Sequence, residues 1–123
     1  MKIAVSATGN TLESQLDLRF GRAAAFIIMD TETMDFEAVD NSGAVAAGGA
    51  GISAAQLVAD KDVEAVITGN VGPNAMNVLK AANIEIYRGN AASVKDNVEQ
   101  FKKGGLTKIN TTVPPHFGMG GRR

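Results

Sequence analysis

Residues 64–75 read Glu64-Ala65-Val66-Ile67-Thr68-Gly69-Asn70-Val71-Gly72-Pro73-Asn74-Ala75, and this stretch decides the fold. Its first part, 64–68, predicts a buried strand that ends at the turn signal Gly69-Asn70. Pro73 stands where a helix begins, because proline is favoured at the first helical position. Apolar residues then recur on one helical face, at Ala75, Val78, Leu79 and Ala82. A strand followed directly by a helix is the unit from which α/β proteins build parallel sheets.

The same alternation of strands and helices continues along the chain in both directions. Ser93, followed three residues later by Asp96, resembles a capping box and predicts the start of the last helix. The predicted strands are 3–5, 26–29, 36–39, 64–68 and 84–87, and the predicted helices are 52–60, 73–82 and 94–101. The second and third strands are close enough in sequence to form a hairpin. We therefore expect an α/β fold of order β-β-β-α-β-α-β-α, with a mixed five-stranded sheet and three helices.

The length of 123 residues allows one domain. We assign a single α/β domain to 1–105 and a flexible C-terminal tail to 106–123. The tail contains Pro114-Pro115 and several glycines, and it has no apolar periodicity after Asn110.

Composition excludes several kinds of site. The chain has no cysteine, which rules out disulfides, thiolate zinc sites, cysteine-ligated iron–sulfur clusters and cysteine nucleophiles. Its single histidine, His116, lies in the predicted tail, where it is either solvated or, with Met119, a ligand for a soft metal. The sequence contains no Ser-His-Asp arrangement and no acidic residue on the first strand, so hydrolytic chemistry is disfavoured.

Charge and hydropathy indicate where the protein works. A net charge of −1 gives no general attraction to nucleic acid. We find no apolar run of membrane-spanning length and no signal peptide, so we expect a cytoplasmic protein. The charge is uneven, with 10 acidic and 4 basic residues in 1–64 against 3 and 8 in 65–123. This asymmetry fits either a solvated surface or a docking surface.

Two glycine-rich turns precede predicted helices, where backbone N–H groups and the helix dipole attract anions. The turn 69–75 lacks the Lys-Ser/Thr pair of a phosphate-binding P-loop, so it is either an anion site or a tight strand-to-helix turn. The segment 48–54 contains G-x-G-x-x-A but lacks the preceding strand and the later acid of a dinucleotide site.

The loop Arg19-Phe20-Gly21-Arg22 is the third candidate site. Two guanidinium groups beside a glycine suit an oxyanion or thioanion. In the alternative interpretation Phe20 fills the edge of the core, and the arginines pair with Glu13 or Asp17.

Taken together, three segments resemble the dinitrogenase iron–molybdenum cofactor biosynthesis family. They are 18–23, 49–57 and 66–75, and the likeness extends to about Phe101. The resemblance implies a ribonuclease H-like three-layer fold and a small, non-enzymatic protein that binds or carries molybdenum–sulfur or iron–molybdenum–sulfur clusters. It also implies a cluster-assembly ATPase as a partner.

Within that family the chain looks like the orange-protein branch, whose members hold a sulfide-bridged molybdenum–copper cluster without cysteine ligands. Nitrogenase-associated members often carry histidine where this chain has Arg19. The resemblance implies capture by Arg22 and by the N–H groups of Gly72 to Asn74. The full set of expected cluster-binding residues is Arg19, Phe20, Gly21, Arg22, Gly51, Gly69, Asn70, Gly72, Pro73, Asn74, Ala75 and Met76, with the last two as apolar cover.

Two other functions use the same features of the sequence. A module for nucleotides or phosphorylated metabolites would use the two helix N-termini. A protein–protein adaptor would use the opposed charges of the two halves of the chain.

Overall fold

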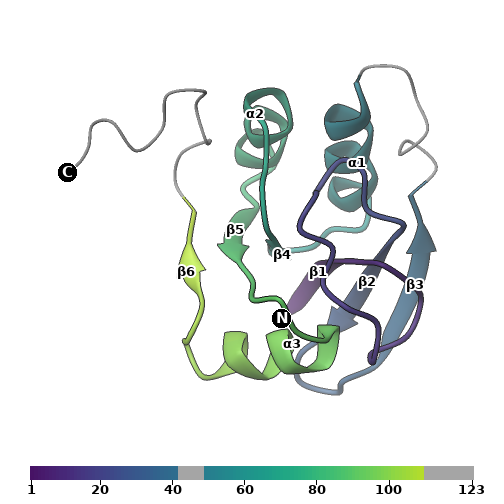
Figure 1. Ribbon diagram of the computed structural model, residues 1–123. Coiled ribbons are helices and arrows are strands. Elements are labelled where there is room, and N and C mark those ends of the chain that lie inside the picture. Colours follow the sequence, from purple (N-terminus) through teal and green to yellow (C-terminus); the bar gives the residue numbers. More distant parts are fainter. Residues whose placement is uncertain (42–48, 110–123) are drawn as a thin grey trace, which may run out of the picture.

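The computed structural model describes residues 1–41 and 49–109 (Figure 1). Its elements in chain order are β1 (Lys2–Ala7), β2 (Ala25–Asp30), β3 (Phe36–Asp40), α1 (Ala50–Ala59), β4 (Ala65–Thr68), α2 (Pro73–Ala81), β5 (Glu85–Arg88), α3 (Val94–Lys102) and β6 (Thr107–Lys108). The α/β class and the predicted order up to α3 are confirmed. The assignment to the ribonuclease H-like folds stays a prediction.

One mixed sheet carries all the described strands, in the order β3-β2-β1-β4-β5-β6. β1 pairs in parallel with β4, and β4 pairs in parallel with β5, as expected for strands joined by helical crossovers. β2 runs antiparallel to both β1 and β3, which confirms the predicted hairpin. β1, β4 and β5 therefore all end at the same edge of the sheet.

The prediction of five strands is wrong, because β6 adds a sixth. Gly104 adopts a left-handed φ of 75° after α3, and this turn returns the chain to the sheet. β6 then pairs antiparallel with β5, and Lys108 Nζ donates to Glu85 Oε2 at 3.0 Å. A two-residue strand is too short to show alternation, so no periodic pattern predicts it.

The ordered fold extends beyond the predicted domain end at residue 105, because the sheet continues to Lys108. The remainder of the predicted tail, 110–123 with Pro114, Pro115 and His116, lies outside the described residues. Its flexibility and the role of His116 stay predictions.

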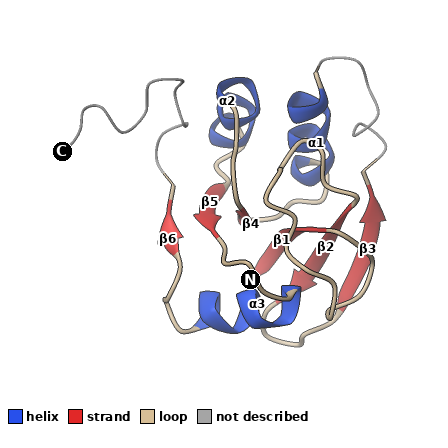
Figure 2. Ribbon diagram, viewed as in Figure 1, coloured by secondary structure: helices blue, strands red, loops and turns tan. Residues whose placement is uncertain are grey.

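The sheet is covered by helices on both faces. Figure 2 shows α1 and α2 on one side and α3 on the other. The core on the α1/α2 side includes Phe20, Phe26, Val66 and Leu79, whereas the core on the α3 side includes residues such as Ile67. Adjacent residues of one strand thus enter different cores, as the two-residue period of a strand requires.

The phenylalanines of the β2–β3 hairpin provide a test of this core. Phe26 is fully buried and packs against Phe20 with ring centroids 5.3 Å apart, whereas Phe36 is 43% exposed. We expect Phe26→Ala to lower the free energy of unfolding by about 3–5 kcal/mol, because it removes a buried ring and leaves a cavity. Phe36→Ala is the matched control and should cost about 1 kcal/mol or less. Chemical denaturation measures both, and equal losses would contradict the assignment of the core.

Candidate functional site

A pocket of about 210 Å³ lies between the first turns of α1 and α2. It is at the edge of the sheet where β1, β4 and β5 end, which is where open α/β sheets bind ligands. Its lining consists of Gly49, Gly51, Ile52, Gly72, Pro73, Asn74 and Ala75. Five of the residues predicted to bind a cluster are therefore brought together, and none of the lining side chains is charged.

The helices at this pocket begin without side-chain caps. Gly49 precedes α1 with a left-handed φ of 70°, and Gly72 precedes α2 in an extended conformation. Neither helix has an acidic residue in its first turn. By contrast, Ser93 caps α3 by accepting a hydrogen bond from the Asp96 N–H at 3.0 Å, which confirms the predicted cap. The first N–H groups of α1 and α2 therefore have no intrahelical acceptor and no side-chain acceptor, and the two helix dipoles favour an anion there.

Small residues allow the two helices to approach each other. A Cβ added to Gly51 would lie 3.2 Å from the Cβ of Ala75, which is tighter than an ordinary contact. Larger residues at either position would separate the first turns of α1 and α2. The resemblance of 49–54 to a dinucleotide fingerprint therefore has another explanation. Gly51 serves the packing between the two helices, Gly49 adopts a left-handed φ, and β3 ends nine residues before Gly49.

The loop that carries Arg19 and Arg22 crosses the end of β4 and reaches α1. Asn70 N–H donates to the Leu18 carbonyl at 2.7 Å, and Phe20 N–H donates to the Asn70 carbonyl at 3.3 Å. A Cβ on Gly69 would lie 2.5 Å from the Leu18 carbonyl oxygen, so only glycine permits this crossing. Gly21 also packs closely on α1, because its added Cβ would lie 2.8 Å from the Gly51 nitrogen. The loop is thus attached at both ends of the pocket.

Three of the predicted cluster-binding residues are parts of the core, and one of them is Ala75, which is 3% exposed. Phe20 is 1% exposed and Met76 is 2% exposed, and both belong to the core cluster under α1 and α2. For Phe20 this agrees with the alternative interpretation, in which its ring fills the edge of the core. Of the two residues expected to provide apolar cover, Ala75 lines the pocket and Met76 does not.

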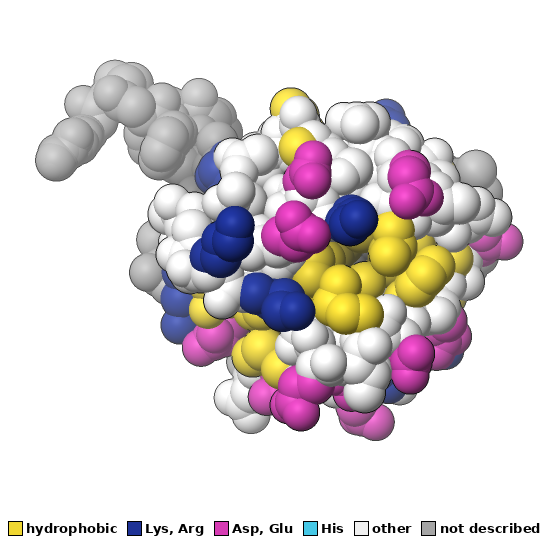
Figure 3. Space-filling view, turned by 90° about the horizontal axis from the view of Figure 1, so that it is seen from below, with side chains coloured by type: hydrophobic (Ala, Val, Ile, Leu, Met, Phe, Trp, Pro, Cys, Tyr) yellow, Lys and Arg dark blue, Asp and Glu magenta, His cyan; other side chains and the backbone are white. Residues whose placement is uncertain are grey.

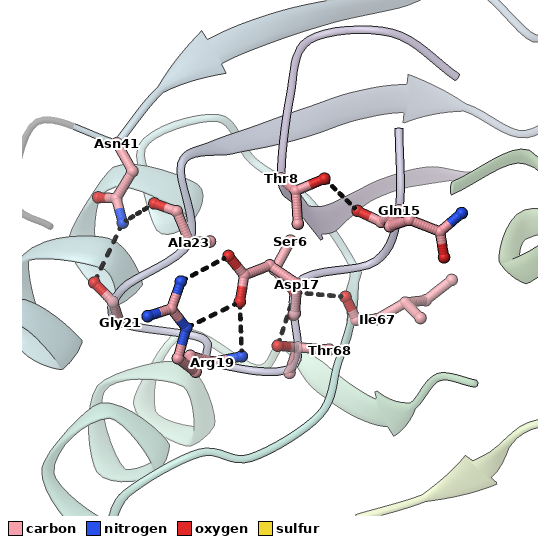
Figure 4. A network of polar contacts seen from close by, with 10 residues as sticks. All are labelled: Ser6, Thr8, Gln15, Asp17, Arg19, Gly21, Ala23, Asn41, Ile67 and Thr68. Carbon is pink, nitrogen blue, oxygen red and sulfur yellow. Dashed lines mark hydrogen bonds and ion pairs between the residues drawn. The ribbon is translucent and has the colours of Figure 1, made fainter. Parts of the chain in front are cut away.

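Arg19 pairs with Asp17, which also agrees with the alternative interpretation of this loop (Figure 4). Arg19 Nε donates to Asp17 Oδ1 and Arg19 Nη2 donates to Asp17 Oδ2, both at 3.2 Å. The hydrogen bond to Asp17, together with its negative charge, raises the pKa of the Arg19 guanidinium above its ordinary value. Arg19 therefore remains a cation. Arg22 is exposed, one residue beyond Gly21.

Buried polar residues that we did not predict hold the loop in place. Ser6 Oγ donates to the Asp17 carbonyl at 2.6 Å and shares a second hydrogen bond of 2.7 Å with Thr68 Oγ1, which ties the loop to the ends of β1 and β4. Asn41 Nδ2 donates to the carbonyls of Gly21 and Ala23 (Figure 4). The only sequence signal for Ser6 and Thr68 is that a hydroxyl group follows an apolar run.

Metal ligation and membrane insertion gain no support from the described residues. In residues 1–41 and 49–109, no group of three or more His, Cys, Asp or Glu side chains is placed to hold a metal ion. Over the same residues, the helices are too short or too polar to cross a bilayer.

Comparison with known proteins identifies relatives that span most of this chain. Residues 1–104 match the family model described as dinitrogenase iron-molybdenum cofactor. The apo form of the orange protein from Desulfovibrio gigas has 39% identity and a TM-score of 0.85, over 88% of this chain and 92% of that protein. A Thermotoga protein assigned to the DUF35 family has 36% identity and a TM-score of 0.83, over 93% and 97%. A Methanocaldococcus jannaschii protein is 32% identical over 112 residues, which cover 89% of this chain and 92% of the relative.

The loop crossing at Gly69 can be tested by adding one methyl group. We expect Gly69→Ala to lower the free energy of unfolding by about 1–3 kcal/mol, because its Cβ would overlap the Leu18 carbonyl. Gly72→Ala is the matched control, since nothing lies within 4 Å of an added Cβ there. It should change stability by about 0.5 kcal/mol or less, because a weaker N-cap is offset by a less flexible unfolded chain. Urea denaturation distinguishes the two, and a tolerated Gly69→Ala would refute the close crossing.

Proposed function

This chain belongs to the dinitrogenase iron–molybdenum cofactor family, and we propose that it binds and carries a preassembled, anionic, molybdenum-containing metal–sulfide cluster without catalysing a reaction. The observation that carries this proposal is the pocket where two helices begin with no side-chain cap and no acidic residue in their first turns. Such a pocket attracts an anion through fixed N–H groups and aligned dipoles.

The donor set of the pocket suits a cluster that brings its own sulfur. Backbone N–H groups and the Asn74 amide donate hydrogen bonds, and bridging or terminal sulfides accept them. The chain has no cysteine, so the sulfides of the cluster itself would complete the coordination of its metals. The pocket lining is otherwise glycine, proline and small or apolar side chains, which leave space for a polarisable cargo.

We propose separate roles for the residues around the pocket. Gly51, Gly72, Asn74 and Ala75 contact the cluster, and Arg22 contributes positive charge from the loop. Pro73 begins α2 without an N–H group, as proline does at the first helical position. Arg19 adds a second positive charge from the same loop. The remaining residues of the predicted set support the site from behind, through the loop crossing and the core: Phe20, Gly21, Gly69, Asn70 and Met76.

The likeness to the orange protein supports a molybdenum–copper sulfide cluster as the cargo, with an iron–molybdenum–sulfur cluster as the alternative. A cluster-assembly ATPase is the protein partner that we propose. This ATPase would load the cluster onto the protein or unload it, and we propose that the protein works in the cytoplasm.

Two other functions predict different results. A nucleotide or phosphorylated metabolite would use the same N–H groups, and it alone predicts that nucleotides raise the melting temperature. An adaptor would use charged surface. On the α3 side of the molecule, acidic and basic side chains are interspersed around exposed apolar atoms, so that face carries no field of a single sign (Figure 3).

The cargo can be tested with tetrathiomolybdate and a copper(I) salt added anaerobically to the full chain. We expect the protein to retain molybdenum, copper and visible charge-transfer absorption through gel filtration. The double variant Arg22→Ala/Asn74→Ala should retain the cluster at least about tenfold less tightly, because it removes charge-assisted and amide hydrogen bonds.

The matched control is Lys95→Ala/Asn77→Ala, which removes one charge and one amide at exposed positions of α3 and α2 outside the pocket lining. It should retain the cluster as the wild type does. A wild-type protein that stays colourless and free of metal under these conditions would overturn the proposal. Stabilisation by a nucleotide instead would favour the phosphate-binding alternative.

A further inference from the structure

An exposed arginine is held by a buried carboxylate at one end of the loop. The Arg19 side chain is 68% exposed, whereas the Asp17 side chain is 6% exposed. An ordinary surface ion pair is solvated on both sides and weak. Here only the cation faces solvent, and the carboxylate is buried.

The hydrogen bonds of Asp17 determine which N–H groups of Arg19 stay available. A guanidinium has five N–H donors in a plane. Asp17 accepts from Nε and from one hydrogen of Nη2, and its Oδ1 also accepts from the Arg19 backbone N–H at 3.0 Å. Within residues 1–41 and 49–109, Asp17 is the one side chain that forms hydrogen bonds with the Arg19 guanidinium. The two hydrogens of Nη1 and the second hydrogen of Nη2 therefore form an outward-facing fork.

Asp17 is itself attached to the sheet through its backbone. Its N–H donates to the Ser6 carbonyl at 2.9 Å, and its carbonyl accepts from Ser6 Oγ at 2.6 Å. Ser6 Oγ also shares a hydrogen bond with Thr68 Oγ1, so the backbone that carries the carboxylate is tied to the ends of β1 and β4 (Figure 4). An Arg19 side chain that is already held by Asp17 loses less conformational entropy when it binds an anion.

The backbone of Arg19 lies beside the start of α2. Arg19 forms a parallel bridge with Asn70, which precedes the first residue of the pocket lining on that side, Gly72, by two residues. Asp17 therefore orients a guanidinium whose backbone lies beside the start of α2.

We propose that Asp17 is a positioning residue that holds the Arg19 guanidinium as a fork for the anionic cargo, an inference that rests on the proposed function. The two possible effects of Asp17 have opposite signs. As a charge, it repels an anion, and its removal would tighten binding. As a positioning group, it keeps Arg19 oriented, and its removal would weaken binding even though the protein gains positive charge.

Asp17→Asn in the full chain separates these effects, because asparagine has nearly the same shape and no charge. We expect it to weaken binding of tetrathiomolybdate with copper(I) by about tenfold, as found when groups that orient ligands are changed. The matched control is Asp62→Asn, which makes the same change of net charge at an exposed position with a left-handed φ of 58° that asparagine tolerates. It should bind as tightly as the wild type or more tightly. Absorption titrations at two salt concentrations, well below the melting temperature, measure both.

Arg19 variants keep the proposal testable if Asp17→Asn does not fold. Arg19→Lys preserves the charge and loses the fork, whereas Arg19→Gln loses both. Positioning predicts that lysine weakens binding nearly as much as glutamine does, and that Asp17→Asn adds little in the Arg19→Lys background. If Asp17→Asn binds as tightly as Asp62→Asn, or if lysine fully replaces Arg19, the role of Asp17 is refuted while the proposed function stands. If the wild type binds no cluster, both fail.

Discussion

The parallel alignment of β1, β4 and β5 is the constraint on which the rest of the structure depends. It brings three strand ends to one edge of the sheet, and the chain leaves that edge each time through a loop or a helix. α1 also begins there, because β3 runs parallel to β1 through two antiparallel pairings. The strand order thus brings two helix N-termini and the arginine-bearing loop to the same edge of the sheet. The site is a consequence of the order of the strands.

Most of the fold could be predicted from the sequence because its strands and helices are long enough to show a period. The apolar face from Ala75 to Ala82 shows a helical period, and the run 64–68 is identified by its unbroken apolar residues and the turn signal that ends it. β6 could not be predicted, since two residues carry no period and its pairing with β5 depends on a left-handed turn at Gly104. Glycine and proline predicted the pocket for a related reason, because each constrains the backbone locally.

The roles of individual side chains in the site were harder to predict. Met76 follows the pocket residue Ala75 in the sequence, and Phe20 lies between Arg19 and Gly21 of the loop, yet both side chains enter the core. Whether a residue in a loop faces the core or the pocket depends on the path of the loop, and that path depends on Gly69 and on hydrogen bonds to Asn70. Asp17, Ser6 and Thr68 come from three separate segments, so their network exists only once the sheet has formed. Single-sequence periodicity contains no information about such contacts.

The uncapped starts of α1 and α2 also affect how the protein behaves when it carries nothing. Because glycine is the N-cap of both helices, each missing side-chain cap leaves a helix less stable by a few tenths of a kcal/mol than a capped one. An anion that accepts hydrogen bonds from those amides restores this stability, so loading and folding are thermodynamically linked. The stability of such a protein therefore depends on whether its site is occupied. The empty form unfolds more readily, and in a cell it is the form that proteases remove first.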